Sequence, residues 1–142
     1  MPRPIDRIYE RRLTQRNAAL ERYLTVLTRE SQAIEHRDTD VLDTALLAER
    51  DVIAELESLS GVIRTIGGCL SPAEDGSTRE RLEQTGAELL QTVKRRHEAV
   101  RQALKGQLDE TGRRLETAAI PRRGRSVFRS ERHGGSMVDI NA

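Results

Sequence analysis

The sequence predicts an all-α protein, an elongated antiparallel bundle of three long helices in coiled-coil-like packing, followed by a disordered C-terminal tail. Of its 142 residues, 36% are apolar, 33% charged and only 2% aromatic. Leucine, alanine, glutamate and arginine dominate, which is typical of long helices that pack along narrow seams. In three stretches the leucines recur at spacings of three, four and seven residues, the period of an amphipathic helix.

The first helix is predicted over residues 5–36. Pro2 or Pro4 suits its first turn, where the missing N–H has no helical partner. Its apolar seam follows at spacings of seven, four, three and seven residues: Leu13, Leu20, Leu24, Leu27 and Ile34. Asn17 and Ser31 fill gaps in this seam, so we expect them to set the register against a neighbouring helix.

The second helix is predicted over residues 39–66. Asp38, Thr39 and Asp40 are all candidate N-caps, because their side-chain oxygens can accept the free N–H groups of a first turn. Gly67 and Gly68 are expected to end the helix through left-handed backbone angles. The apolar stripe is wide enough to contact two neighbours, which predicts that this helix is the central one. Its members are Leu42, Ala45, Leu46, Val52, Ile53, Leu56, Leu59, Ile63 and Ile66.

The third helix is predicted over residues 78–119. Two capping boxes precede it, beginning at Ser71 and Ser77, and Gly76 favours the later one because it would interrupt a helix begun earlier. Gly86, Gly106 and Gly112 weaken this helix by about 1 kcal/mol each relative to alanine. The apolar set is Leu82, Leu89, Val93, Val100, Leu104, Leu108 and Leu115.

These helices make one domain, residues 1–120, and residues 121–142 form a basic tail. The tail lacks apolar periodicity, so we expect it to be disordered when alone. It carries five arginines against Glu131 and Asp139, a charge of +3, whereas residues 17–120 carry −5. Two apolar islands interrupt it and are candidate docking residues: Val127 and Phe128, then Met137, Val138 and Ile140.

The expected helix lengths do not match. At about 1.5 Å per residue, the third helix reaches roughly 60 Å, against roughly 47 and 42 Å for the other two. If the helices fold back and forth, the second covers the third only to about Leu104. The remaining apolar side chains would project without a partner, which commonly marks a docking site. They are Leu108, Leu115, Ala118, Ala119 and Ile120. A self-associating dimer and a bend at Gly106 are the alternatives.

No enzymatic constellation is visible. The three histidines, His36, His97 and His133, have no second ligand at metal spacing and are expected to be solvated. Paired carboxylates such as Glu49 with Asp51 are interpreted as solvated helix faces. Cys69 has no partner cysteine, so it is interpreted as an unreactive thiol. We therefore predict no catalytic residue, metal ion or cofactor.

Partners other than proteins are not expected. Arginine-rich runs such as Lys94 to Arg96 resemble a phosphate-binding stripe, but no interleaved aromatics accompany them and the body of the chain is acidic. No nucleic acid partner is therefore predicted. No apolar run approaches the roughly 20 residues that cross a bilayer, and the N-terminus lacks an apolar signal-peptide core. A cytoplasmic location is the simplest expectation.

Two parts of the sequence share a pattern with a known family. The first half combines leucines, glutamates, a short acidic break and a second amphipathic helix: Tyr23, Leu24, Leu27, Glu30, Ile34, Asp38, Leu42, Glu49, Arg50, Ile53, Leu56 and Leu59. The tail contains an aromatic residue, glycine and an apolar-Asp motif: Phe128, Gly134, Gly135, Ser136, Met137, Val138 and Asp139. In both parts the sequence resembles the FlgN-type flagellar export chaperones.

The resemblance implies a cytoplasmic protein, monomeric or weakly dimeric, that holds the C-terminal helices of hook-filament junction subunits and delivers them to the export gate. Family members bind these clients through the end of the third helix and the tail. The expected contact residues are therefore Val100, Leu104, Leu108, Leu115, Ala119, Ile120 and both tail islands. The alternative hypothesis is a structural adaptor that self-associates through the seam of the third helix.

Overall fold

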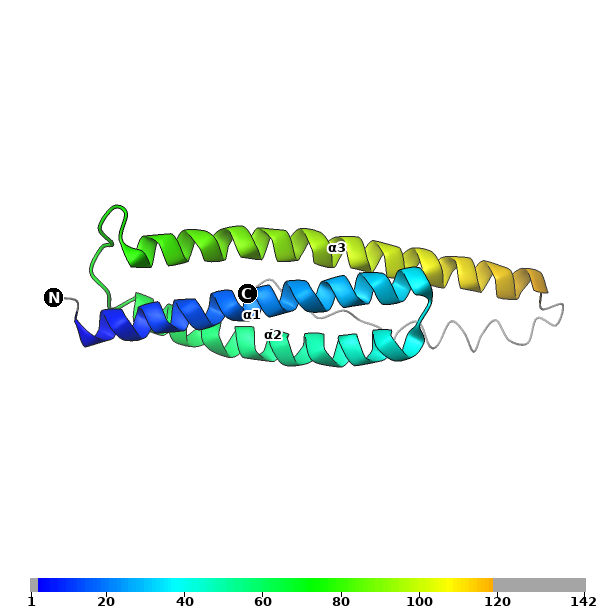
Figure 1. Ribbon diagram of the computed structural model, residues 1–142, viewed down its shortest axis with the longest axis horizontal. Coiled ribbons are helices and arrows are strands. Elements are labelled where there is room, and N and C mark those ends of the chain that lie inside the picture. The colour runs from blue at the N-terminus through cyan, green and yellow to red at the C-terminus, as the bar shows by residue number, and fades with distance from the viewer. Residues whose placement is uncertain (1–2, 119–142) are drawn as a thin grey trace.

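The computed structural model describes residues 3–118, which form three long helices. Helix α1 runs from Pro4 to His36, α2 from Thr39 to Gly67 and α3 from Thr78 to Ala118. The three lie side by side in alternating directions, so the protein is an elongated antiparallel bundle (Figure 1). The predicted all-α class is confirmed, and each helix boundary falls within one residue of its predicted place. The predictions for residues 119–142 lie outside the described residues.

The helix starts follow the capping chemistry of the sequence. Asp38 is the cap of α2, since its carboxylate accepts a hydrogen bond from the Val41 N–H at 3.1 Å. Ser77 caps α3, since its hydroxyl accepts one from the Glu80 N–H at 3.2 Å. The Glu80 carboxylate in turn accepts the Gly76 N–H at 2.9 Å. The later of the two capping boxes is therefore the one that starts the third helix.

The end of α2 does not use the predicted left-handed glycine. Gly68 has right-handed helical angles, with φ −67° and ψ −14°. The left-handed residues of the described chain are instead Arg37, with φ 55° in the turn between α1 and α2, and Gly76, with φ 73° before α3. Arg37 needs this conformation in the tight turn after α1, because its backbone N–H must reach back to the Ala33 and Ile34 carbonyls of the last helical turn.

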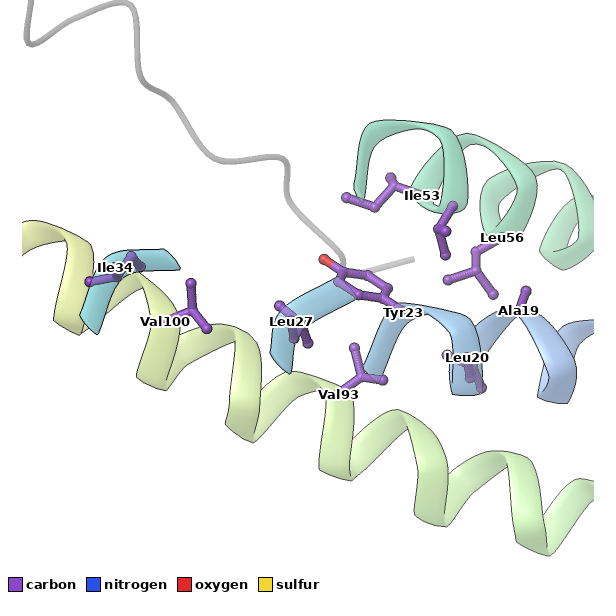
Figure 2. Packing of buried hydrophobic residues seen from close by; sticks show 10 residues of the cluster. Ala19, Leu20, Tyr23, Leu27, Ile34, Ile53, Leu56, Val93 and Val100 are labelled. Atoms are coloured by element: carbon purple, nitrogen blue, oxygen red, sulfur yellow. The ribbon is translucent and has the colours of Figure 1, made fainter. Parts of the chain in front are cut away.

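The central helix is α1, and the prediction that the second helix is central is wrong. Helix α1 packs extensively against both α2 and α3, whereas α2 and α3 barely approach each other. Eleven residues of α1 are buried, compared with seven of α2 and four of α3, so α1 contributes half of the buried residues of the three helices. Figure 2 shows this arrangement: Ile53 and Leu56 reach α1 from α2, and Val93 reaches it from α3.

The core of the bundle follows heptad columns on α1 that the leucine seam alone does not show. Beside that seam, small and β-branched residues recur every seven positions at Ala19, Val26 and Ala33, and all three are buried. The extra column widens the buried stripe of α1, so it can serve two neighbours. The main core cluster is Ala19, Leu20, Tyr23, Leu27, Ile34, Val52, Ile53, Leu56, Val93 and Val100.

The two polar seam residues behave differently. Asn17 is buried, and its side-chain amide donates to the Leu82 carbonyl of α3 at 3.1 Å. It therefore ties α1 to α3 at one register, as predicted. Ser31 is exposed and makes no such link. Its neighbour Glu30 is the buried residue instead, because Glu30 belongs to the heptad column of Tyr9 and Tyr23.

Two glycines of α3 should respond in opposite directions to alanine. A Cβ on Gly86 would overlap the Arg16 guanidinium and lie 2.7 Å from Asn17 Oδ1, whereas a Cβ on Gly106 would meet nothing within 4 Å. We expect Gly106→Ala to raise the free energy of unfolding by up to about 1 kcal/mol, through helix propensity. We expect Gly86→Ala to lower it by about 1 to 3 kcal/mol, because the Arg16 guanidinium and the buried, hydrogen-bonded Asn17 amide must move aside.

Urea unfolding followed by circular dichroism measures both values. Each protein serves as the other's control, since the same methyl group is added to the same helix. Equal stabilisation by the two changes would mean that α3 does not approach Asn17 as closely as the structure places it. The role of Gly86 is therefore to let α3 approach Arg16 and Asn17 of α1 closely, and not to weaken the helix.

Within residues 3–118, no helix combines the length and the apolar character that crossing a membrane requires.

Candidate functional site

The distal end of α3 projects beyond the other two helices. Its last contacts with the rest of the bundle are at the turn after α1. There the Gln107 side-chain amide donates to the Ile34 carbonyl, and the Arg37 guanidinium lies 3.8 Å from the Glu110 carboxylate. From Glu110 to Ala118 the helix continues for roughly 12 Å, past the turn between α1 and α2 (Figure 1). The predicted overhang therefore exists, although it begins later along α3 than expected.

Two leucines near the end of α3 are exposed to solvent, Leu108 just before this projecting segment and Leu115 within it. Leu108 retains 56% of its accessible surface and Leu115 retains 38%. They are seven residues apart, which places them on the same side of the helix two turns from each other. A pair of aligned, exposed leucines on a helix end is the kind of surface that another amphipathic helix can cover. We call Leu108 and Leu115 the distal leucine pair.

Two other predicted contact residues belong to the core instead. Val100 is 6% exposed and is a member of the main core cluster, and Leu104 is half-buried against it. The assignment of Val100 to a partner surface is therefore wrong. The reason is the position of α1, which runs beside α3 as far as Ile34, so Val100 packs into the core before the bundle ends.

The remaining predicted contact residues lie outside the described part of the chain, which ends at Ala118. They are Ala119, Ile120, Val127, Phe128, Met137, Val138 and Ile140. Their assignment stays a prediction from the sequence.

A buried polar cluster joins the three helices at mid-length. Glu30 and Tyr23 of α1 are fully buried, and Glu49 of α2 and His97 of α3 are 4% and 7% exposed. His97 Nε2 lies 4.0 Å from Glu49 Oε1, and the His97 ring meets the Tyr23 ring edge-on at 6.4 Å between centroids. Among residues 3–118, the Glu30 carboxyl oxygens, the Tyr23 hydroxyl and His97 Nε2 have no hydrogen-bond partner.

This environment disfavours the ionised form of Glu30. Burial, reinforced by the adjacent Glu49 carboxyl, raises the pKa of Glu30 to about 9. The Glu30 carboxyl is therefore protonated in the folded protein at neutral pH. Burial also raises the pKa of the Tyr23 phenol, with further contributions from Glu49 and Glu30. Both shifts arise from taking a charge out of water without a cation nearby to compensate it.

The cluster corrects two expectations from the sequence. His97 and Glu49 are buried, whereas both are predicted to be solvated. The signal that identifies them is heptad position: Glu49 is seven residues from Leu42 and from Leu56, and His97 is seven residues from Leu90 and from Leu104. Polar residues on a core column are buried with that column, because side chains at this spacing share one face. His36, by contrast, is exposed as predicted, and His133 lies outside the described residues.

The polar cluster is not arranged as a metal site. Across residues 3–118, no three His, Cys, Asp or Glu side chains converge closely enough to hold a metal ion. Cys69 is exposed in the connection between α2 and α3.

No protein-family model matches this chain, and neither a curated protein nor a solved structure matches it significantly.

Proposed function

We propose that this protein is a FlgN-type flagellar export chaperone. In this proposal it is a cytoplasmic carrier that binds the C-terminal helical segments of hook-filament junction subunits, prevents their early assembly and delivers them to the type III export gate. The distal leucine pair carries the proposal, because Leu108 and Leu115 are exposed and aligned on a helix that extends past its own bundle. The sequence resemblance supplies the class of client.

The proposed mechanism is burial of a client helix against the end of α3. An amphipathic client segment would place apolar side chains over the distal leucine pair, which removes from water the stripe that the client otherwise uses for assembly. The apolar tail residues Val127 and Phe128 would add to this contact. Holding a client in this way consumes no nucleotide, and ordering of the tail on binding would limit the affinity, which suits a carrier that must release its cargo.

We expect the double substitution Leu108→Asp and Leu115→Asp to weaken binding of a client C-terminal peptide at least tenfold, as measured by titration calorimetry. Two carboxylates at the proposed contact would have to be desolvated on binding. The fold should be unaffected, since both positions face solvent. Leu47→Asp is the matched control, because Leu47 is 60% exposed on α2, away from the proposed site. Unchanged affinity in the double variant would show that clients bind elsewhere.

Self-association through the same leucines is the second candidate function. A structural adaptor would use exposed Leu108 and Leu115 to pair with a second copy of the chain. Analytical ultracentrifugation separates the two functions. A concentration-dependent oligomer that the double variant abolishes, together with no binding of client peptides, would favour the adaptor.

A further inference from the structure

A groove runs between α2 and α3 on the side of the bundle where those two helices do not meet. It has a volume of about 280 Å³. Apolar side chains from all three helices line part of it: Leu20 of α1, Ile53 and Leu56 of α2, and Leu90 of α3. Polar groups lie among the remaining lining residues: Arg16, Glu57, Ser60 and Glu83.

The groove exists because the central helix is α1. With α2 and α3 each packed on α1 and barely on each other, their facing sides form two walls with α1 beneath. Its volume falls just below the range of about 300 to 1,000 Å³ that small-molecule pockets occupy. Such a space suits two or three aliphatic side chains of a peptide segment.

We propose that the groove binds the C-terminal end of this same chain, with the apolar side chains of Met137, Val138 and Ile140 placed against Leu20, Ile53 and Leu90. This inference does not depend on the proposed chaperone function. It concerns the protein without a client, and the groove is separate from the distal leucine pair that is proposed to bind clients.

The length of the chain beyond Ala118 supports this occupant. Leu90 lies roughly 42 Å from Ala118 along α3. An extended chain spans at most about 3.5 Å per residue, so Phe128 can reach roughly 35 Å from Ala118 while Val138 can reach roughly 70 Å. The island at Met137 to Ile140 therefore reaches the groove with slack, and the island at Val127 and Phe128 does not.

Covalent attachment and charge both favour docking of the segment from Met137 to Ile140 in the groove. The segment is attached to α3, which is itself one wall of the groove, so its effective concentration there is on the order of millimolar and even a weak contact is populated. The segment over 121–142 carries a net charge of +3, whereas residues 1–120, which include the whole bundle, carry −2. The long-range attraction between them favours a folded-back tail over an extended one.

Cys69 provides the test, because it is exposed and is the sequence's only cysteine. It follows α2 shortly beyond Ser60, at the groove end of the bundle. A nitroxide label on Cys69 should broaden the backbone amide signals of Met137, Val138 and Ile140 in a ¹⁵N-labelled protein, with most of their intensity lost. The signals of Val127 and Phe128 should be affected much less. Full intensity at all five positions would overturn the proposal.

Two variants of α3 check that the groove is responsible. Ala87→Trp places an indole in the groove that Ala87 lines and should restore the intensity of the tail signals. Ala99→Trp adds the same side chain at an exposed position of the same helix outside the groove, and should leave the broadening unchanged. Broadening that persists in Ala87→Trp would place the tail on another surface and overturn the proposal.

A mixing experiment distinguishes docking within one chain from docking between copies. A ¹⁵N-labelled Cys69→Ser protein is combined with unlabelled protein that carries the nitroxide. Intramolecular docking predicts no broadening of the tail signals in this mixture. Broadening would show that the tail binds the groove of a second copy, contrary to the proposal. No client is present in any of these measurements, so their failure would leave the proposed chaperone function unaffected.

Discussion

Replacement of Glu30 with glutamine is expected to stabilise the protein at pH 8 by a few kcal/mol. Burial and the Glu49 carboxyl raise the pKa of Glu30 in the folded state, whereas in the unfolded chain it is near its usual value. Between these two pKa values the folded state holds a proton that the unfolded state has released. The free energy of unfolding of the wild type should therefore fall as pH rises, by about 1.4 kcal/mol per pH unit from this group.

The contribution of protonated Glu30 to the free energy of unfolding is fully present below the pKa that Glu30 has in the unfolded state. This contribution is lost as pH rises toward the pKa that Glu30 has in the folded state. Urea unfolding at pH 5 and at pH 8 measures the effect. The wild type should lose stability across this interval, and Glu30→Gln should lose much less, since its amide does not ionise. Glu35→Gln on the exposed face of α1 is the control and should follow the wild type. A Glu30→Gln protein with the wild-type pH slope would show that Glu30 is charged in the fold.

The groups around Glu30 define where this effect acts. Tyr23 lies on the same helix, Glu49 faces it from α2 and His97 faces Glu49 from α3. Ionisation of Glu30 places a negative charge beside Glu49 at the junction of all three helices. Because α2 and α3 are held together mainly through α1, we expect alkaline pH to loosen this junction before the helix ends.

Leu27→Ala is expected to lower the free energy of unfolding by about 2 to 5 kcal/mol. Leu27 is 1% exposed on the central helix, in the core cluster that also contains Val52 of α2 and Val100 of α3. The substitution leaves a cavity that α1 cannot close without moving away from one of its two partners. A loss of this size is a large fraction of the stability of a domain this small.

Leu47→Ala is the matched control, since it makes the same chemical change at a position 60% exposed. It should change the free energy of unfolding by less than about 0.5 kcal/mol. Both values come from urea denaturation at pH 5, where Glu30 is protonated in the fold. Similar small losses for the two leucines would contradict the central place of α1.

Much of the fold follows from local chemistry and was predictable. Helices α2 and α3 begin at caps that can be recognised within a few residues, Asp38 before α2 and Ser77 before α3. The leucine seam of α1 and the apolar stripe of α2 are buried or half-buried where the spacing predicts. Asn17 sets a register as a polar seam residue does. Leu108 and Leu115 are also exposed as predicted, Leu115 because α3 is longer than the other two helices and Leu108 because it faces away from α1.

Prediction from the sequence misses the polar cluster because it gives the polar residue type more weight than the heptad position. Glutamate and histidine on a charged helix are usually solvated, so Glu49 and His97 were expected on the surface. Each lies between two leucines of its own heptad column, seven residues to either side, and the packing of three helices buries the side chain at that position. The unusual burial of Glu30 has the same origin, in the column that it shares with Tyr9 and Tyr23.

The number of helices, their boundaries and the main apolar stripe of each can be predicted from the sequence, because these depend on contacts within a few turns of one chain segment. The central position of α1, the shielding of Val100 and the groove between α2 and α3 depend on tertiary packing. Amphipathic stripes of similar width can pair in more than one order. The choice among these orders depends on how well distant side chains fit together, as Gly86 fits beneath Asn17, and no local pattern records that fit.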